Sequence, residues 1–414
     1  MNRSITCFLF LAILTGSLQA QTAENWRGQH RQGIYNETGL KQEWPAGGPE
    51  LVWAYEGLGE GFSSPVFANG RIYITGMEEE TGYLYMLSPA GVTEKKIKYG
   101  EEFHQAYPGS RSTPAIAGDR AYLVSGHGRL VCIDTGNGNI LWERDLFGDF
   151  DGSNLRWGLT ENLIIDGDRI FCAPGGSKYN IVSLNRHNGE IIWASEGAGG
   201  LSAYCSPLLV SHNGRKLLVT MMHSDIVGVD AATGRKLWSH PHKNRHSVHP
   251  NTPVYHEGSI FAVSGYGLGG VKLRLNPGGD AVTEEWFNSD IDTQLGGVVL
   301  VEGYIYGSGD RNRRWFSVDW ETGETVYSSR DLDKGAVIWA DGRLYCYTER
   351  GELALMEPTQ EEFIIRGQTT ITLGSDQHWA HPVINNGMLY VRRGNALLAF
   401  NIGSDSAALS RQSD

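Results

Sequence analysis

The sequence of 414 residues has no excess of basic side chains: 35 Lys and Arg stand against 47 Asp and Glu, for a formal net charge of −12. Proteins that bind nucleic acids usually present a basic face, so this balance argues against such a partner. There is no Gly-x-Ser-x-Gly, no P-loop and no dinucleotide-binding glycine motif. After residue 20, no apolar run approaches the length of a bilayer crossing. We therefore expect no nucleic-acid partner and no membrane span.

Cysteine is also scarce, with five residues in the chain. Cys7 lies near the N-terminus, and no cysteines are adjacent or form a Cys-x-x-Cys or haem-attachment motif. Scattered cysteines in a large core are usually buried as small apolar side chains. We expect free thiols at Cys132, Cys172, Cys205 and Cys346.

The first 20 residues have the features of a cleavable secretion signal. Arg3 precedes a short apolar core at residues 5–14, and a polar segment then ends at Ala20. The core is too short to cross a bilayer comfortably. This pattern predicts a signal peptide at residues 1–20 and a periplasmic or secreted product.

Glycine and aromatic residues are abundant, with 54 Gly, 12 Trp, 18 Tyr and 13 Phe. Glycine suits tight turns, and aromatic side chains favour the half-buried faces of β-sheets. One unit recurs, in which a turn Gly follows an Asp or Asn by four residues and an aromatic residue follows by eight, as in Asp230, Gly234 and Trp238. A short polar residue and a Gly make a tight hairpin turn, and the aromatic residue begins the outermost strand.

The units begin at eight equivalent positions, 39 to 49 residues apart. Four-stranded propeller blades repeat at about this length. The chain is therefore predicted to be all-β, an eight-bladed β-propeller. We expect its innermost strands to begin at Pro65, Pro114, Leu163, Pro207, Pro253, Val298, Val337 and Pro382.

The last unit stops at Asn401 without an outer strand or a Trp, and residues 50–55, with Trp53, supply both. Pairing the two ends closes the ring and removes two exposed sheet edges. We therefore divide the chain into a signal peptide (1–20), an N-terminal arm (21–48), the propeller (49–402) and a flexible tail (403–414).

The Asp-x-x-Thr-Gly-x-x-x-Trp element at residues 230–238 resembles the tryptophan-docking repeat of quinoprotein alcohol dehydrogenases and of outer-membrane assembly lipoprotein propellers. Stretches such as Asn-Trp-Arg-Gly at 25–28 and His-Trp-Ala-His-Pro at 378–382 look like exported bacterial proteins with pyrroloquinoline-quinone (PQQ) repeats. The dehydrogenases use an adjacent Cys-Cys pair, a Trp floor, and Glu, Asn and Asp near calcium. The resemblance thus implies PQQ with calcium as a cofactor, although this chain has no adjacent cysteines.

All links between blades cross the same face of a propeller, so their last residues should ring one mouth of the central channel. Loops on a rigid scaffold often carry function, and aromatic walls with converging polar groups suit a small ligand. The links predict a ligand site without an assigned catalytic residue, built from Tyr107, Arg111, Trp157, Glu161, Tyr204, His249, Asn251, Gln294, His378, Trp379 and His381.

Four histidines at 240, 242, 246 and 249 raise the question of a metal site. Two of them follow Trp238 on the outer strand and two approach the centre, so they should point to different places. No Cys pair or His-Glu-x-x-His spacing supports them. We therefore expect no metal ligands here.

Three functions remain open. A noncatalytic binding or assembly scaffold of the periplasm or cell envelope is favoured, because a shared fold without shared site residues transfers architecture alone. Its partner would be an envelope protein or a small-molecule or glycan ligand, and the chain would be a monomer without a firm cofactor. The alternatives are a PQQ-dependent oxidoreductase of alcohols or sugars, and a carbohydrate-active enzyme that uses the His, Trp and Arg residues of the mouth.

Overall fold

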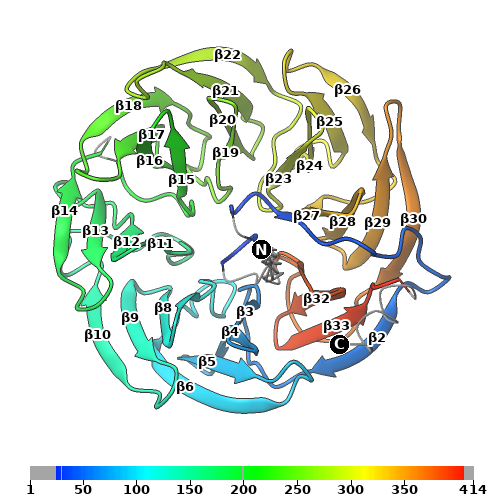
Figure 1. Ribbon diagram of the computed structural model, residues 1–414, viewed down its shortest axis with the longest axis horizontal. Helices are drawn as coiled ribbons and strands as arrows, with labels where there is room; N and C mark the ends of the chain where they lie inside the picture. The colour runs from blue at the N-terminus through cyan, green and yellow to red at the C-terminus, as the bar shows by residue number, and fades with distance from the viewer. Residues whose placement is uncertain (1–24, 29, 198–199, 405–414) are drawn as a thin grey trace, which may run out of the picture.

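Eight small sheets form a closed ring in the computed structural model, and all are antiparallel apart from one short parallel strand added to one of them (Figure 1). The structure describes residues 25–28, 30–197 and 200–404. The proposed signal peptide lies outside these residues, as do most of the tail and the first part of the arm. No helix in the described part of the chain is long and apolar enough to cross a membrane.

Each blade runs outward from a short inner strand, and the first four blades follow one another along the chain. They comprise β3 (Val66–Ala68), β4 (Arg71–Glu78), β5 (Thr81–Leu87) and β6 (Thr93–Glu101); β7 (Ala115–Ala117), β8 (Arg120–Val124), β9 (Arg129–Asp134) and β10 (Ile140–Asp145); β11 (Ile164–Asp166), β12 (Arg169–Cys172), β13 (Ile181–Asn185) and β14 (Ile191–Ser195); and β15 (Leu208–His212), β16 (Arg215–Met221), β17 (Asp225–Asp230) and β18 (Lys236–Pro241).

The remaining blades complete the ring, and two of them take a strand from the N-terminal region. They comprise β19 (Val254–His256), β20 (Ser259–Ser264), β21 (Gly269–Leu275) and β22 (Val282–Asn288); β23 (Val298–Val301), β24 (Tyr304–Ser308), β25 (Trp315–Asp319) and β26 (Thr325–Ser329); β27 (Gly335–Ala340), β28 (Arg343–Thr348), β29 (Glu352–Pro358) and β30 (Phe363–Thr370), with β1 (Ile34–Tyr35) beside β27; and β31 (Val383–Asn385), β32 (Met388–Arg393) and β33 (Ala396–Asn401), with β2 (Glu50–Tyr55) outermost.

The predicted all-β, eight-bladed fold is confirmed, as are the starts of its blades. Six inner strands begin one residue after the expected position, and β23 begins at Val298 as expected. The exception is β27, which begins two residues before Val337, at Gly335. Pro at the residue before a strand needs no ladder partner, which explains the regular one-residue offset.

The ring closes through β2 and β33, which pair antiparallel from Glu50 opposite Asn401 to Tyr55 opposite Leu397. The Trp53 indole Nε1 donates to the Pro89 carbonyl at 3.1 Å. Its ring lies so close to Gly91 that a β-carbon there would stand 2.7 Å from Trp53 Cε3. The first and last segments of the propeller therefore share one blade and bind its neighbour.

The same contact recurs for the outer-strand Trp of three further blades, whereas the Trp238 indole makes no hydrogen bond. A register irregularity in the outer strand precedes each of these Trp side chains, and the extra residue aims the ring at the next blade. The indoles donate to a carbonyl in the next blade's turn: Trp142 to Arg186, Trp193 to Ala231 and Trp286 to Trp320. Apolar side chains fill the space between sheets, and the four cysteines of the propeller are buried free thiols, as expected.

The N-terminal arm crosses the central channel, a placement that the sequence does not predict. In Figure 1 the blue segment that leads to β1 lies across the centre of the ring. Arg27 Nη2 donates to the Val298 carbonyl at 2.7 Å, and Arg31 Nη1 donates to the Asn162 carbonyl at 2.8 Å. These acceptors belong to blades on different sides of the channel. The arm thus spans the channel from one side to the other and lies across it.

Candidate functional site

Links from seven blades send one side chain each to the channel mouth, four residues before the inner strand begins. These residues are Phe62, Arg111, Thr160, Tyr204, Pro250, Gln294 and Trp379. Asn162, Ser206 and His381 lie two residues before their strands and line the same space. Side chains of an extended chain alternate in direction, so the spacing of two and four residues aims all of them inward.

The side chains enclose a cavity of about 290 Å³, here called the mouth cavity. Its wall is dominated by aromatic rings from several blades and from the arm: Trp26, Phe62, Tyr107, Trp157, Tyr204, Tyr266 and Trp379. The Tyr107 ring lies 4.8 Å from that of Trp379, and the Trp157 ring lies 6.0 Å from that of Tyr204 (centroid distances). Flat apolar faces with few polar groups between them suit a ring-shaped ligand.

Three of these tyrosines have a left-handed backbone, with φ of 50° at Tyr107, 70° at Tyr204 and 61° at Tyr266. Bulky residues seldom adopt positive φ, because it brings the β-carbon close to the backbone carbonyl, at a cost of about 1–2 kcal/mol per residue. Such conformations cluster at sites where function fixes the direction of a side chain. Three tyrosines with this conformation around one cavity are consistent with a wall whose side-chain directions are fixed for binding.

The arm supplies the floor. Trp26 lines the mouth cavity, and Arg27 beneath it is fully buried. The His381 Nδ1 atom accepts from Arg27 at 2.8 Å, and its Nε2 atom donates to the Leu295 carbonyl at 3.1 Å. Burial and the nearby guanidinium hold the pKa of His381 well below its usual range, so its imidazole is neutral at pH 7.

The Arg111 side chain forms hydrogen bonds with the backbone of the link on which it lies. Its guanidinium donates to the carbonyls of Ala106 at 2.9 Å and Tyr107 at 2.8 Å, and it also reaches those of Phe103 and Gly109. Burial lowers the pKa of Arg111 to about 10. The side chain therefore shapes the link that carries Tyr107, and its donors are occupied by backbone oxygens.

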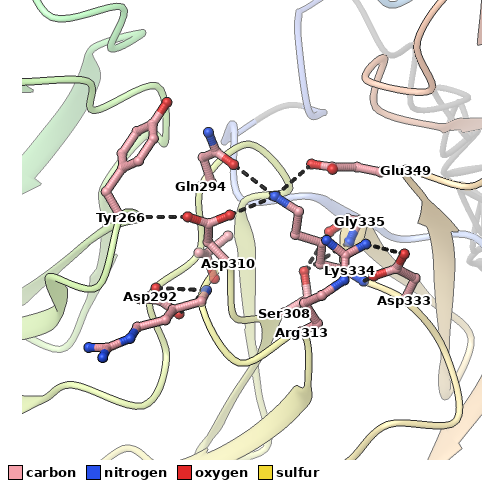
Figure 2. Close-up of polar contacts among 12 residues, drawn as sticks. Tyr266, Asp292, Gln294, Ser308, Asp310, Arg313, Asp333, Lys334, Gly335 and Glu349 are labelled. Atoms are coloured by element: carbon pink, nitrogen blue, oxygen red, sulfur yellow. Dashed lines mark hydrogen bonds and ion pairs between the residues drawn. The ribbon is translucent and has the colours of Figure 1, made fainter. Parts of the chain in front are cut away.

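A polar cluster borders the cavity beside Gln294 (Figure 2). The Lys334 ammonium lies 2.6 Å from Asp310 Oδ1, 2.8 Å from Gln294 Oε1 and 3.3 Å from Glu349 Oε1. Burial opposes the charge of Lys334, but the hydrogen bond to Asp310 and the attraction of Glu349 raise its pKa. The two carboxylates are thus paired with one ammonium.

The structure brings seven of the eleven predicted site residues together around the mouth cavity: Tyr107, Arg111, Trp157, Tyr204, Gln294, Trp379 and His381. The other four do not line it, and each lies three or five residues before its inner strand, an odd number. Three of them bond to groups behind the wall. His249 Nδ1 contacts Ser264 Oγ at 2.8 Å, and Asn251 donates to the Thr293 carbonyl at 2.7 Å. Glu161 accepts from the Ala173 amide at 2.9 Å.

His378 also lies outside this cavity, where its Nδ1 contacts the Tyr347 hydroxyl at 2.6 Å. Burial lowers the pKa of His378 to about 4 and that of His249 to about 4. In the histidine run, the ring of His242 lies 6.1 Å from that of His249, and burial lowers the pKa of His242 to about 3. These imidazoles are neutral at pH 7, which disfavours proton exchange by them.

Sequence reasoning missed several lining residues that lie on other loops. Tyr266 is in the turn between β20 and β21, and Glu349 follows β28. These turns lie on the same face as the links, because the second strand of each blade runs toward the mouth. Trp26 comes from the arm, for which no repeat pattern gave a position.

The burial of the Glu161 carboxyl behind the cavity wall can be tested through the pH dependence of stability. Burial raises its pKa to about 8, although the Ala173 amide and Arg31 oppose the rise. A raised carboxyl pKa means that the folded state holds the proton more tightly, so the stabilisation is complete below the usual pKa and is lost as pH rises through 8. One pKa unit corresponds to about 1.4 kcal/mol, so the buried charge costs a few kcal/mol at pH 9.

Glu161→Gln should therefore match the wild type in stability at pH 5 and exceed it at pH 9. The measurement is the urea midpoint of each protein at both pH values. Glu361→Gln, at an exposed position, is the control and should show no such divergence. Parallel pH profiles for wild type and Glu161→Gln would contradict the burial argument.

The closed ring of eight blades, with its recurring indole contacts, defines a PQQ-type β-propeller. The chain belongs to the family described as outer membrane protein assembly factor BamB, whose model matches residues 93–329.

Individual relatives are distant. The chain is 26% identical over 166 residues to a protein of that name from Kangiella koreensis, covering 40% of this chain and 37% of the relative. It is 24% identical over 245 residues to the quinoprotein alcohol dehydrogenase PedH of Pseudomonas putida, covering 56% and 38%. The chain thus spans less than two-fifths of either curated relative. The crystal structure of BamB from Moraxella catarrhalis matches with a TM-score of 0.62 at 13% identity, over 85% of this chain and 99% of that one.

Proposed function

We propose that this protein is a noncatalytic binding module that acts after export, in the periplasm or cell envelope, and holds a neutral, ring-bearing ligand such as a sugar in its mouth cavity. The observation that carries the proposal is an aromatic wall without a free charge. Arg111, Glu349 and His381 line the cavity, and each is bonded to other groups of the protein.

Because the ionisable groups that line the cavity are bonded to other groups of the protein, the cavity is better suited to binding than to catalysis. A general acid or base needs an accessible group with a pKa near the working pH. His381 is neutral and bonded at both ring nitrogens, and Glu161 lies behind the cavity wall. A neutral sugar places C–H groups on aromatic faces and needs only a few polar partners. The Thr160 hydroxyl donates to the Tyr204 carbonyl and Gln294 Oε1 accepts from Lys334, so the partners offered are the Gln294 amide nitrogen as donor and the Thr160 oxygen as acceptor.

The charged groups around the cavity are a poor fit for PQQ with calcium. PQQ carries several carboxylates, and calcium takes six to eight oxygen ligands. The Arg111 guanidinium already donates to backbone carbonyls, so it is not available to bind a carboxylate of PQQ. Lys334 occupies the position between Asp310, Glu349 and Gln294 where a cation would sit (Figure 2). The site therefore supports no cofactor-dependent step.

The envelope role draws on two further points. The family is described as an outer membrane protein assembly factor, and the first 20 residues have the pattern of a secretion signal. An envelope protein is the expected partner of such a scaffold, and a glycan-binding mouth would place the propeller near the cell-wall or outer-membrane surface.

Tryptophan fluorescence titration tests the binding proposal, because Trp26, Trp157 and Trp379 all line the cavity. Glucose-, mannose- and N-acetylglucosamine-based oligosaccharides serve as probes, with PQQ and calcium as the competing class. We expect saturable binding of a neutral saccharide. Saturable PQQ binding with dye reduction in the presence of an alcohol would overturn the proposal.

Trp157→Ala and Trp379→Ala should abolish saccharide binding, since stacking on an aromatic face contributes most of the contact. Both side chains lie in the mouth rather than between sheets, so the melting temperature should change little. Phe287→Ala removes an aromatic side chain that is 47% exposed on β22, away from the cavity, and is the matched control. Unchanged affinity in both tryptophan variants would exclude the mouth cavity as the site.

A further inference from the structure

A second cluster of ligand-type side chains lies between the first two blades, on the same face as the mouth. Glu101 ends β6, His104 follows on the link, and His127 lies in the turn between β8 and β9. One ligand atom from each of the three lies within 4.8 Å of the others. Glu80, in the turn between β4 and β5, places Oε1 3.5 Å from His104 Nε2.

The orientation of His104 suits a metal ligand. Its Nδ1 atom lies 3.3 Å from the backbone carbonyl of Glu102, to which it can donate. That contact leaves a lone pair on Nε2, which lies on the side of Glu80 and is also 3.4 Å from Gln105 Nε2, an exposed amide that a metal ion would displace. Histidine ligands in metal sites usually have their second nitrogen fixed in this way, by a carbonyl or carboxylate.

His127 presents a buried nitrogen to the same space. Its Nε2 atom makes no hydrogen bond, and it lies 3.8 Å from Glu101 Oε1. The rings of His104 and His127 are 6.2 Å apart. A buried polar atom without a hydrogen bond costs free energy, and coordination of a cation would remove that cost.

The backbone beneath the cluster is held by Glu102. Its buried carboxylate accepts from the Gly126 amide at 2.7 Å and from the Phe103 amide at 3.2 Å, and its own amide donates to the Glu80 carbonyl at 2.9 Å. One residue therefore ties together all three segments that carry the candidate ligands. The fold therefore fixes the backbone positions from which the candidate ligands extend.

We propose that Glu101, His104 and His127, with Glu80 or water as a fourth ligand, form a site for a first-row divalent metal ion of the zinc class. Two imidazoles and carboxylate oxygens are ligands that Zn²⁺ prefers, at about 2.0–2.2 Å. A contraction of the side chains by an ångström or so around the ion brings the present spacings to those of a tetrahedral site. The ion would fasten the link that carries Tyr107 and Arg111 into the mouth cavity.

Isothermal titration of metal-stripped full-length protein with ZnCl₂ tests the site, and Co²⁺ absorption reports its geometry. We expect one equivalent of bound zinc and a tetrahedral Co²⁺ spectrum. His104→Ala and His127→Ala should each weaken binding by at least ~10-fold, since even loss of an outer-shell partner costs about 10–100-fold. Zinc should raise the melting temperature of the wild type but not of these variants.

His187→Ala is the matched control, because His187 is an exposed histidine that lies 2.7 Å from the single carboxylate of Asp168. It should bind zinc as the wild type does. Glu101→Gln tests the cluster at an exposed position, so that folding is preserved if a histidine variant is unstable. The proposal fails if the stripped protein takes up no stoichiometric zinc, or if the His104, His127 and Glu101 variants all bind it with wild-type affinity.

Discussion

Deleting residues 49–56 should abolish cooperative folding of the propeller at physiological temperature. The deletion removes β2, whose pairing with β33 is the only link that makes the eighth blade four-stranded among the described residues. It leaves the edge of β33 unpaired and Trp53 absent from its contact with Gly91 and Pro89. An unpaired apolar edge also invites association with other chains. Circular dichroism melts and size-exclusion chromatography are the measurements.

Point variants in β2 separate the contribution of ring closure to stability from the disruption that any deletion of eight residues causes. Trp53→Ala should lower stability by about 3 kcal/mol, somewhat less than for a fully buried Trp because the side chain is only half-buried. Val52→Ala, in the same strand but 52% exposed, is the control and should change stability by less than ~0.5 kcal/mol. A truncated protein that melts within a few degrees of the full chain would show that ring closure contributes little.

The sequence predicts the propeller well because each blade repeats the same local chemistry. The Asp-to-Trp turn fixes the outer hairpin, and the Pro before the inner strand marks where a blade begins. The arm is different, since residues 25–48 contain no repeat and their position depends on long-range contacts. Arg27 and Arg31 look like surface cations in the sequence, yet both are buried in the channel.

The mouth cavity is lined by the links that the sequence indicates, but the sequence does not distinguish which residues of each link face it. Side chains alternate in direction along an extended chain, so neighbouring residues of one link face opposite sides. Asn162, two residues before its strand, lines the cavity, and its neighbour Glu161 points behind the wall. His381 and Trp379 line it in the same way, and His378 does not. Counting in steps of two from each strand start separates these residues near the strands, but it does not extend to Trp157, which lies seven residues before Ile164 and still lines the cavity.

Arg27→Met should destabilise the protein by about 3 kcal/mol or more and open the floor of the mouth cavity. Met fills similar space without a donor, so the Val298 and Val337 carbonyls lose the guanidinium that approaches them at 2.7 Å and 3.2 Å. A buried carbonyl left without a donor costs about 1–3 kcal/mol. His381 Nδ1 also loses its partner at 2.8 Å.

The effect on binding follows from the place of Arg27 in the arm. It anchors the segment that carries Trp26 into the mouth cavity, so its loss should weaken saccharide binding even where the variant remains folded. Urea denaturation and fluorescence titration measure the two effects separately. Arg330→Met, at an exposed position, should alter neither. If Arg27→Met retained wild-type stability, the Arg27 contacts would not be needed by the ring, and the floor of the cavity would be held by Arg31 and β1.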